Sequence, residues 1–160
     1  MTETLAEALE QEHVDIDAGM DAFTTGLAAG DPPVEEMLAA MAALRRHIYL
    51  EEAILFPPLR DQGFFGPVMV MLMEHGRMWQ IMDELEPLVR AGATDSRIEG
   101  LCMDLMAQIG AHNPKEEQIL YPEADATLNG RASAELRAFL DTGALPDGWI
   151  CQYSKAHETH

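Results

Sequence analysis

Two segments of the chain share an unusual pattern of histidine, glutamate and proline. The first begins at His47 and reads HIYLEEAILFP, and the second begins at His112 and reads HNPKEEQILYP. In both, a glutamate follows the histidine by four residues, as Glu51 and Glu116. That spacing puts an imidazole and a carboxylate on one face of an α-helix. Side chains of these two kinds bind iron, manganese and zinc, so each segment is a candidate half of a metal site.

A single histidine precedes each segment by a similar interval. His13 stands 34 residues before His47, and His75 stands 37 residues before His112. Each of these earlier histidines directly follows a glutamate. The chain therefore presents the order His, His-x3-Glu, His, His-x3-Glu, which predicts one site assembled from two related halves.

Helix start and stop signals divide the chain into four long helices and a tail. Thr4 opens a capping box, Asp31 is an N-cap followed by proline, Pro67 opens the third helix, and Ser96 caps the fourth. No segment shows the alternation of a strand. The expected helices run from Thr4 to the region 26–30, over 31–57, over 67–92 and over 96–122, with a short fifth at 131–141. We expect an all-α fold, with an irregular tail after the short helix.

The apolar stripes of these helices carry the histidines into the core. In the second helix Leu44, His47, Glu51 and Ile54 share one face, and the other three helices repeat this arrangement around their own histidines. A single buried histidine is explained by a hydrogen bond, but four on four core stripes are not. Burying the two carboxylates without partners would cost roughly several kcal/mol each. The candidate metal ligands are His13, His47, Glu51, His75, His112 and Glu116.

Other residues have simpler interpretations. Glu52 and Glu117 fall one residue off the inward faces, which favours solvated helix surface. The eleven methionines are adaptable core residues, and Cys102 is interpreted as packing. His157 and His160 lie in a polar tail and have no evident chemical role.

Composition excludes several classes of partner. The formal charge of −18, from 28 acidic and 10 basic residues, repels phosphate backbones, so nucleic acid is not an expected partner. No apolar run approaches the ~20 residues of a membrane span, and the acidic N-terminus is not that of a signal peptide. Cys102 and Cys151 form neither a CxxC motif nor a disulfide framework. We expect a cytoplasmic protein, a monomer or weak homodimer.

The complete pattern resembles the hemerythrin-like (HHE cation-binding) domain family, over approximately residues 5–125. The resemblance implies an up-down-up-down four-helix bundle, like that of the related myohemerythrin, around a non-haem di-iron centre. It implies that the four histidines are terminal ligands, and that Glu51 and Glu116 bridge two iron ions that also share an oxo or hydroxo bridge. Residues 1–128 would form this bundle, and residues 129–160 would pack on it or trail from it.

Two departures from the oxygen-carrying hemerythrins change the expected ligand count. Those proteins have a second histidine one turn after the third-helix histidine, where this chain has Trp79. Their last carboxylate is an aspartate five residues after its histidine, where this chain has Glu116 at four. Four histidines leave each six-coordinate iron with positions for the bridge and one exogenous ligand. We expect Trp79 to pack beside the centre and limit access to it.

Two further residues bear on the geometry of the site. Asp17 follows His13 by one turn, and it either lies at the surface, fills a coordination position or holds a ligand histidine. Pro114 removes a backbone hydrogen bond inside the fourth helix, so a kink or bulge is expected beside His112.

Three functions fit this pattern. The first is a di-iron protein that binds dioxygen or a related small ligand, as a carrier, sensor or scavenger. The second is a di-iron oxidoreductase acting on peroxide or nitric oxide, or an iron donor for cluster repair. The third is a structural dimetal site, for example with zinc. The rate of autoxidation and the turnover of peroxide or nitric oxide separate the first two, and metal analysis tests the third.

Overall fold

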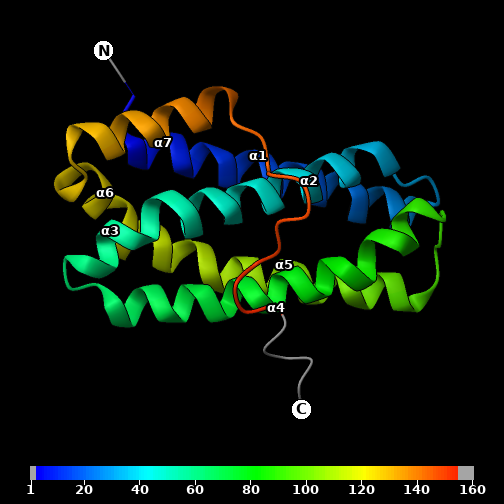
Figure 1. Ribbon diagram of the computed structural model, residues 1–160. Coiled ribbons are helices and arrows are strands. Elements are labelled where there is room, and N and C mark those ends of the chain that lie inside the picture. The colour runs from blue at the N-terminus through cyan, green and yellow to red at the C-terminus, as the bar shows by residue number, and fades with distance from the viewer. Residues whose placement is uncertain (1–2, 155–160) are drawn as a thin grey trace.

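The computed structural model describes residues 3–154, and every regular element in that range is helical (Figure 1). Four long helices dominate the fold, and shorter helical segments extend two of them and cover one side. The helices and helical turns are α1 Leu5–Ala29, α2 Val34–Leu50, η1 Glu51–Leu55, α3 Phe56–Asp61, α4 Phe65–Arg90, α5 Ser96–Lys115, η2 Glu116–Leu120, α6 Tyr121–Thr127 and α7 Gly130–Thr142.

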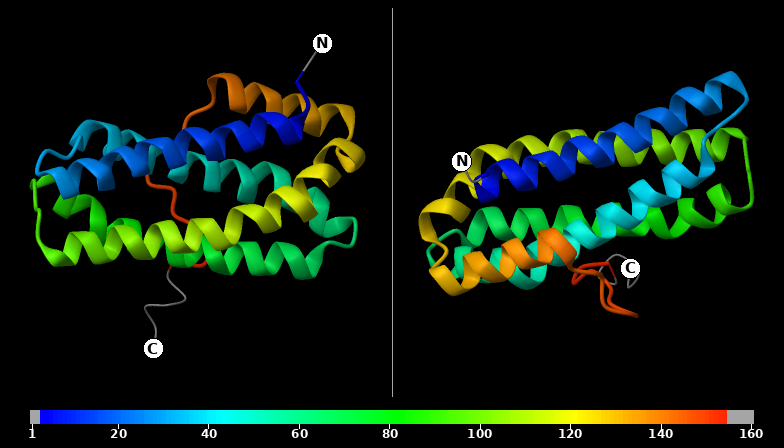
Figure 2. Two further views of the ribbon diagram at one scale, coloured as in Figure 1. Left: turned by 180° about the vertical axis from the view of Figure 1, so that it is seen from behind. Right: turned by 90° about the horizontal axis from the view of Figure 1, so that it is seen from above.

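The long helices form an up-down-up-down bundle. Each packs on two others in the cyclic order α1, α2, α4, α5, and consecutive long helices run in opposite directions (Figure 2). Helix α7 lies along the outside of α1 and α2, and the segment after it crosses α2 and α4 (Figure 1). The all-α fold, the bundle and the short C-terminal helix are therefore confirmed.

Three of the four expected helix starts are confirmed only approximately. Helix α4 begins at Phe65, two residues before Pro67. The capping box at Thr4 is present, with reciprocal bonds to Glu7. The side chain that caps α5 is Asp95 rather than Ser96, because the Asp95 carboxylate accepts hydrogen bonds from the backbone N–H groups of Arg97 and Ile98. Asp31 is not the N-cap of α2, which begins after Pro33 without a side-chain cap. The backbone N–H of Asp31 instead bonds to Gly26 and closes the end of α1.

Helices α2 and α5 do not end at the prolines that follow them. A single π-helical turn precedes each proline, and the helix then continues as α3 or α6. The N–H groups of Phe56 and Tyr121 bond to carbonyls five residues back, at Glu51 and Glu116. A proline in a continuous α-helix clashes with the carbonyl four residues back and leaves it without a donor. The wider turn accommodates Pro57 and Pro122, so the expectation that the second helix stops at residue 57 is wrong.

The bulge expected beside His112 lies further along the chain. It begins at Glu116, and the same turn occurs at Glu51–Leu55, where Tyr49 stands in the place of Pro114. The prolines shared by the two copies come after the turn, so they, and not Pro114, account for it.

The core consists of two hydrophobic clusters, one toward each end of the bundle. The first contains Ile16, Met41, Met82 and Ile109, and the second contains residues such as Leu9, Leu50, Leu72 and Leu120. The histidines and glutamates of the predicted site fall between these two sets along every long helix. The bundle therefore encloses the polar residues in a layer between two apolar ones. Within residues 3–154, no helix combines the length and apolar character that crossing a membrane requires.

Candidate metal centre

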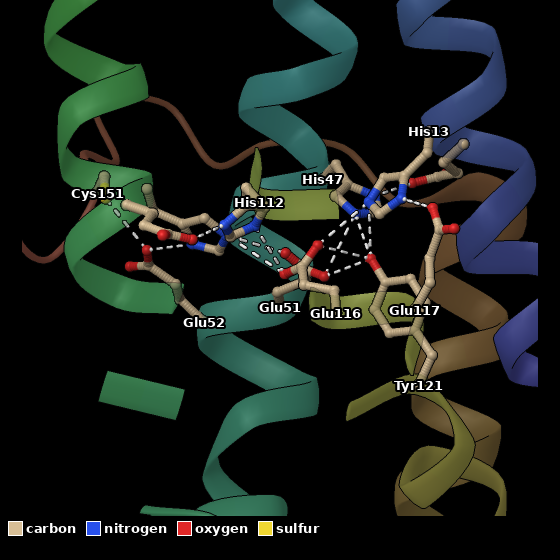
Figure 3. A network of polar contacts seen from close by, with 12 residues as sticks. His13, His47, Glu51, Glu52, His112, Glu116, Glu117, Tyr121 and Cys151 are labelled. Atoms are coloured by element: carbon tan, nitrogen blue, oxygen red, sulfur yellow. Dashed lines mark hydrogen bonds and ion pairs between the residues drawn. The ribbon is translucent and has the colours of Figure 1, made fainter. Parts of the chain in front are cut away.

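The six predicted ligands meet in the middle of the bundle, although they come from four helices and two π turns (Figure 3). All are buried, with exposed fractions between 0% and 4%. Their ligand atoms form two groups that share two carboxylates. The first half-site contains His13, His47, Glu51 and Glu116, and the second half-site contains His75, His112, Glu51 and Glu116.

Each shared carboxylate directs one oxygen to each half-site. In the first half-site, Oε2 of Glu51 lies 3.4 Å from Nε2 of His47, and Oε1 of Glu116 lies 3.2 Å from Nε2 of His13. In the second half-site, Oε1 of Glu51 lies 3.0 Å from Nε2 of His75. There, Oε2 of Glu116 lies 3.0 Å from Nε2 of His112. Ligands at right angles on an ion, each about 2.1 Å from it, are about 3 Å apart. The separations therefore suit two neighbouring cations.

Four further glutamates hold the outer nitrogens of the four histidines. Each Nδ1–H group has a carboxylate within hydrogen-bonding distance, at 2.7–2.9 Å. The pairs are His13 with Glu117, His47 with Glu12, His75 with Glu52, and His112 with Glu74. A carboxylate on the outer nitrogen fixes the ring and makes the inner nitrogen a stronger donor to a metal. Each of the four imidazoles is therefore oriented with its Nε2 lone pair toward the shared carboxylates.

The prediction that Glu52 lies on the solvated helix surface is wrong, and for Glu117 it is wrong in part. The Glu52 side chain is only 4% exposed, and the Glu117 side chain is 35% exposed while bonded to His13. An ideal α-helix places these residues off the inward face, but the π turns that begin at Glu51 and Glu116 alter the direction of the following side chains. In the sequence, each of these glutamates is the second residue of a Glu-Glu pair that follows a candidate ligand histidine. This repeated pair was the signal for their contacts with histidines.

The outer carboxylates are themselves anchored in different ways. Arg46 donates to Glu12 at 2.8 Å, and Lys115 pairs with Glu74. Glu52 accepts from the Cys151 thiol at 3.1 Å and from the backbone N–H of Gln152 at 3.0 Å. Cys151, whose role the sequence left open, is thus part of the layer around the centre (Figure 3).

The donor set fits a pair of cations. With each Nδ1–H donated outward, each Nε2 presents a lone pair to a carboxylate oxygen, and two acceptors at 3.0 Å repel one another. Glu51 Oε1, His75 Nε2 and Glu116 Oε2 are fully buried and have no hydrogen-bond partner among the described residues. Such atoms are costly in a protein interior unless a cation lies between them.

The pKa shifts of the buried histidines and of Glu116 also show that the carboxylates favour positive charge beside them. Burial acts to lower the pKa of His47, but the charge of Glu51 and the bond with Glu12 outweigh it and raise the pKa to about 10. The pKa of His75 is likewise raised well above its ordinary value, against the effect of burial, by bonds to the surrounding carboxylates. Burial acts to raise the pKa of Glu116, but the neighbouring histidines hold it well below its ordinary range. A bound cation meets this demand without protonating the imidazoles.

The hydroxyl of Tyr121 is a member of the centre that the ligand prediction missed. It lies 2.7 Å from Glu51 Oε2 and 3.0 Å from Glu116 Oε1 in the first half-site. On a continuous α-helix, residue 121 would point well away from residue 116, but the π turn brings the two to one face. The sequence predicted an exogenous ligand beside the bridge, and in this half-site the phenol oxygen lies among the candidate ligand atoms.

Asp17 and Trp79 do not join either half-site. Asp17 lines a small pocket with Met106 and Ile109, and burial together with the charges of Asp21 and Glu117 raises its pKa despite the opposing charge of His13. Trp79 is buried as expected, but its ring packs against Arg45 and Trp149, on the side covered by the C-terminal segment. These contacts of Trp79 do not support the expectation that it packs beside the metal site and limits access to it.

The remaining predictions concern residues outside the centre. Cys102 is buried in the first cluster, as expected for a packing residue, and most methionines of the inward stripes are buried as well. The core interpretation is wrong for Met73 and Met103, which are 53% and 71% exposed. His157 and His160 lie outside the described residues.

Comparison with known families agrees with the geometry. Residues 3–124 match the hemerythrin HHE cation binding domain. No curated protein and no solved structure matches the chain. Because the family match spans more than half of the 160 residues and includes all six buried candidate ligands, the chain belongs to the hemerythrin HHE cation-binding domain family.

Proposed function

We propose that the protein holds two iron ions, one in each half-site, and binds dioxygen or a related small ligand as a carrier, sensor or scavenger. The observation that carries this proposal is the position of Glu51 and Glu116. Each carboxylate belongs to both half-sites and presents a different oxygen to each. A carboxylate used in this way would hold both ions, whereas a single-ion site would not need two such residues.

The ligand types favour iron over a structural zinc site. Structural zinc takes a closed set of four ligands, commonly including cysteine thiolates, and neither half-site contains a thiol. Mixed imidazole and carboxylate ligands with further open positions suit iron. When bound, an iron pair supplies reversible electron exchange with a small ligand.

The protein's own residues prepare the site for that ligand. Glu12, Glu52, Glu74 and Glu117 hold the imidazoles in one tautomer, so the inner nitrogens are directed before any ion arrives. The two hydrophobic clusters enclose the polar layer from both ends of the bundle and exclude bulk water. Exclusion of water protects a reduced centre from uncontrolled oxidation.

The test is metal content combined with spectroscopy on the full chain. The protein is loaded with iron(II) under anaerobic conditions, the iron per chain is measured, and the absorption spectrum is recorded before and after oxygen and after its removal. Two irons per chain and a spectral change that reverses when oxygen is removed support the proposal. Fewer than two irons, or a preference for zinc, would overturn it.

A second function has support from a specific observation. Four carboxylates bonded to four ligand histidines increase the electron density at the metals and stabilise their oxidised form. A centre that oxidises readily suits a di-iron oxidoreductase that consumes peroxide or nitric oxide, or a donor of iron for cluster repair. Rapid irreversible oxidation by oxygen, with sustained consumption of peroxide or nitric oxide, favours this function over reversible binding.

A further inference from the structure

The Tyr121 phenol oxygen lies at similar distances from all four candidate ligand atoms of the first half-site. It lies within hydrogen-bonding distance of two imidazole nitrogens and two carboxylate oxygens (Figure 3). The distances are 2.9 Å to His13 Nε2, 3.0 Å to His47 Nε2, 2.7 Å to Glu51 Oε2 and 3.0 Å to Glu116 Oε1. In an octahedron with bonds of about 2.1 Å, each corner is about 3 Å from four other corners. The phenol oxygen therefore lies where a fifth ligand of one ion would lie.

A hydrogen bond alone does not account for this position. A phenol has one hydrogen to donate, but four acceptors surround it. In neutral imidazoles whose Nδ1–H groups bond to Glu117 and Glu12, both Nε2 atoms face Tyr121 with lone pairs. The hydroxyl is completely buried, and no water can satisfy the surplus acceptors from outside. A cation among the five atoms removes this repulsion.

The internal repeat provides a natural comparison. Phe56 occupies in the first segment the place of Tyr121 in the second. Its ring stacks on His75, with centroids 5.6 Å apart, and it offers no oxygen to the second half-site. The three buried atoms without a hydrogen-bond partner, Glu51 Oε1, His75 Nε2 and Glu116 Oε2, all face that half-site. The two halves therefore differ in the number of protein ligands they present.

We propose that Tyr121 is a fifth protein ligand in the first half-site, and that the exogenous small ligand consequently binds at the second. This inference rests on the proposed di-iron centre. The phenol O–H proton leaves to solvent as the oxygen binds the ion. With five protein ligands, a six-coordinate ion would keep one position, for the bridge to the second ion. The half-site of His75 and His112 offers four protein ligands, so its ion would keep one position beyond the bridge.

Visible spectroscopy of the iron-loaded full chain tests the assignment. A phenolate bound to iron(III) gives a charge-transfer band in the visible region, with phenolate vibrations in the resonance Raman spectrum. The wild type should show this band at two irons per chain. Tyr121→Phe should lose the band while retaining iron, because the ring still fills its buried space. Tyr49→Phe is the matched control and should keep the band, since Tyr49 packs against Phe139 and Trp149 away from the ligands.

Azide binding tests the second part of the proposal. The wild type should bind one azide per di-iron centre, and Tyr121→Phe should bind a second because the first half-site gains a vacant position. A band in the double variant Phe56→Tyr with Tyr121→Phe supports the equivalence of the two repeat positions.

The outcomes separate this inference from the function on which it rests. Two irons per chain with no phenolate band, or with a band that survives in Tyr121→Phe, would overturn the role of Tyr121 and leave the di-iron proposal intact. Fewer than two irons in the wild type would overturn both.

Discussion

The carboxylate of Glu12 lies 2.7 Å from Nδ1 of His47, on the neighbouring helix, although its sequence neighbour His13 is itself a candidate ligand. The second copy of the repeat has the same arrangement. The carboxylate of Glu74 lies 2.8 Å from Nδ1 of His112, on the neighbouring helix, and does not contact Nδ1 of its sequence neighbour His75. In each Glu-His dipeptide, the histidine is therefore a candidate ligand, and the glutamate bonds to a candidate ligand on the neighbouring helix. This exchange joins α1 to α2 and α4 to α5, so the pairing of the helices and the orientation of the imidazoles depend on the same contacts.

Neutralising these outer carboxylates should weaken metal binding without removing a ligand. Glu12→Gln and Glu74→Gln keep the shape of the side chain but lose its charge, so the bonded imidazole becomes a weaker donor. We expect each variant to bind iron roughly 10–100-fold more weakly. Competition with a chelator of known affinity measures the change. Glu84→Gln, at an exposed position of α4, is the control and should match the wild type. Equal affinities in all four proteins would contradict a supporting role for Glu12 and Glu74.

Removing a shared carboxylate should have a larger effect. Glu51→Ala or Glu116→Ala deletes an oxygen from both half-sites, so at least one of the two irons should be lost. Because bound metal stabilises the folded state, the melting temperature of iron-loaded protein should fall in both variants. Metal analysis after gel filtration and thermal unfolding followed by circular dichroism provide the measurements. Retention of two irons by both variants would refute the assignment of these glutamates.

Much of this architecture could be predicted because the relevant signals are local and periodic. The stripes of apolar residues and the capping box at Thr4 give the helices. The repeated His-x3-Glu spacing, with the histidine that precedes each copy, gives the six residues that meet in the core. These predictions depend only on which residues share a face of a regular α-helix.

The predictions that failed depend on departures from that regularity. Assigning Tyr121 to the centre required the π turn before Pro122, and the position of Glu52 required the turn before Pro57. An ideal helix of 3.6 residues per turn places both residues off the inward face. The partner of each outer carboxylate depends on how two helices pack, and spacing within one helix carries no information about that. The contact of Cys151 with Glu52 joins residues 99 apart, so no local pattern indicates it.

Both cysteines should be resistant to alkylation in the folded protein. Burial raises the pKa of the Cys102 thiol to about 11, and burial together with the charge of Glu52 raises that of Cys151 to about 12. A raised pKa keeps the thiol protonated, and the thiolate is the reactive form, so labelling by iodoacetamide should stay slow up to well above pH 8. Unfolding in guanidinium chloride returns both pKa values to about 8.5 and should accelerate labelling at pH 8 by more than about 100-fold. Labelling of either native cysteine at the rate of the unfolded chain would contradict its burial.

The close approach of Gly76 to the C-terminal segment should make that position intolerant of any side chain. A Cβ atom at Gly76 would lie 2.8 Å from the carbonyl oxygen of Tyr153 and 2.9 Å from its carbonyl carbon, and a backbone cannot yield as a flexible side chain does. Gly76→Ala should therefore displace the segment that carries Cys151 and free Glu52 from its two tail donors. We expect a loss of about 1–3 kcal/mol in the free energy of unfolding and faster alkylation of Cys151.

Two controls accompany the Gly76→Ala measurement. Gly100→Ala, in a helix and with no atom within 4 Å of the added Cβ, should instead stabilise the protein by roughly 0.5–1 kcal/mol, because alanine is the better helix former. Cys102 lies in the first hydrophobic cluster, so its protection in Gly76→Ala reports whether the bundle itself is intact. Selective labelling of Cys151, with Cys102 still protected, is the expected result. If Cys151 in Gly76→Ala stays as protected as in the wild type, the added methyl group does not lift the segment, and the tail does not depend on the glycine at position 76.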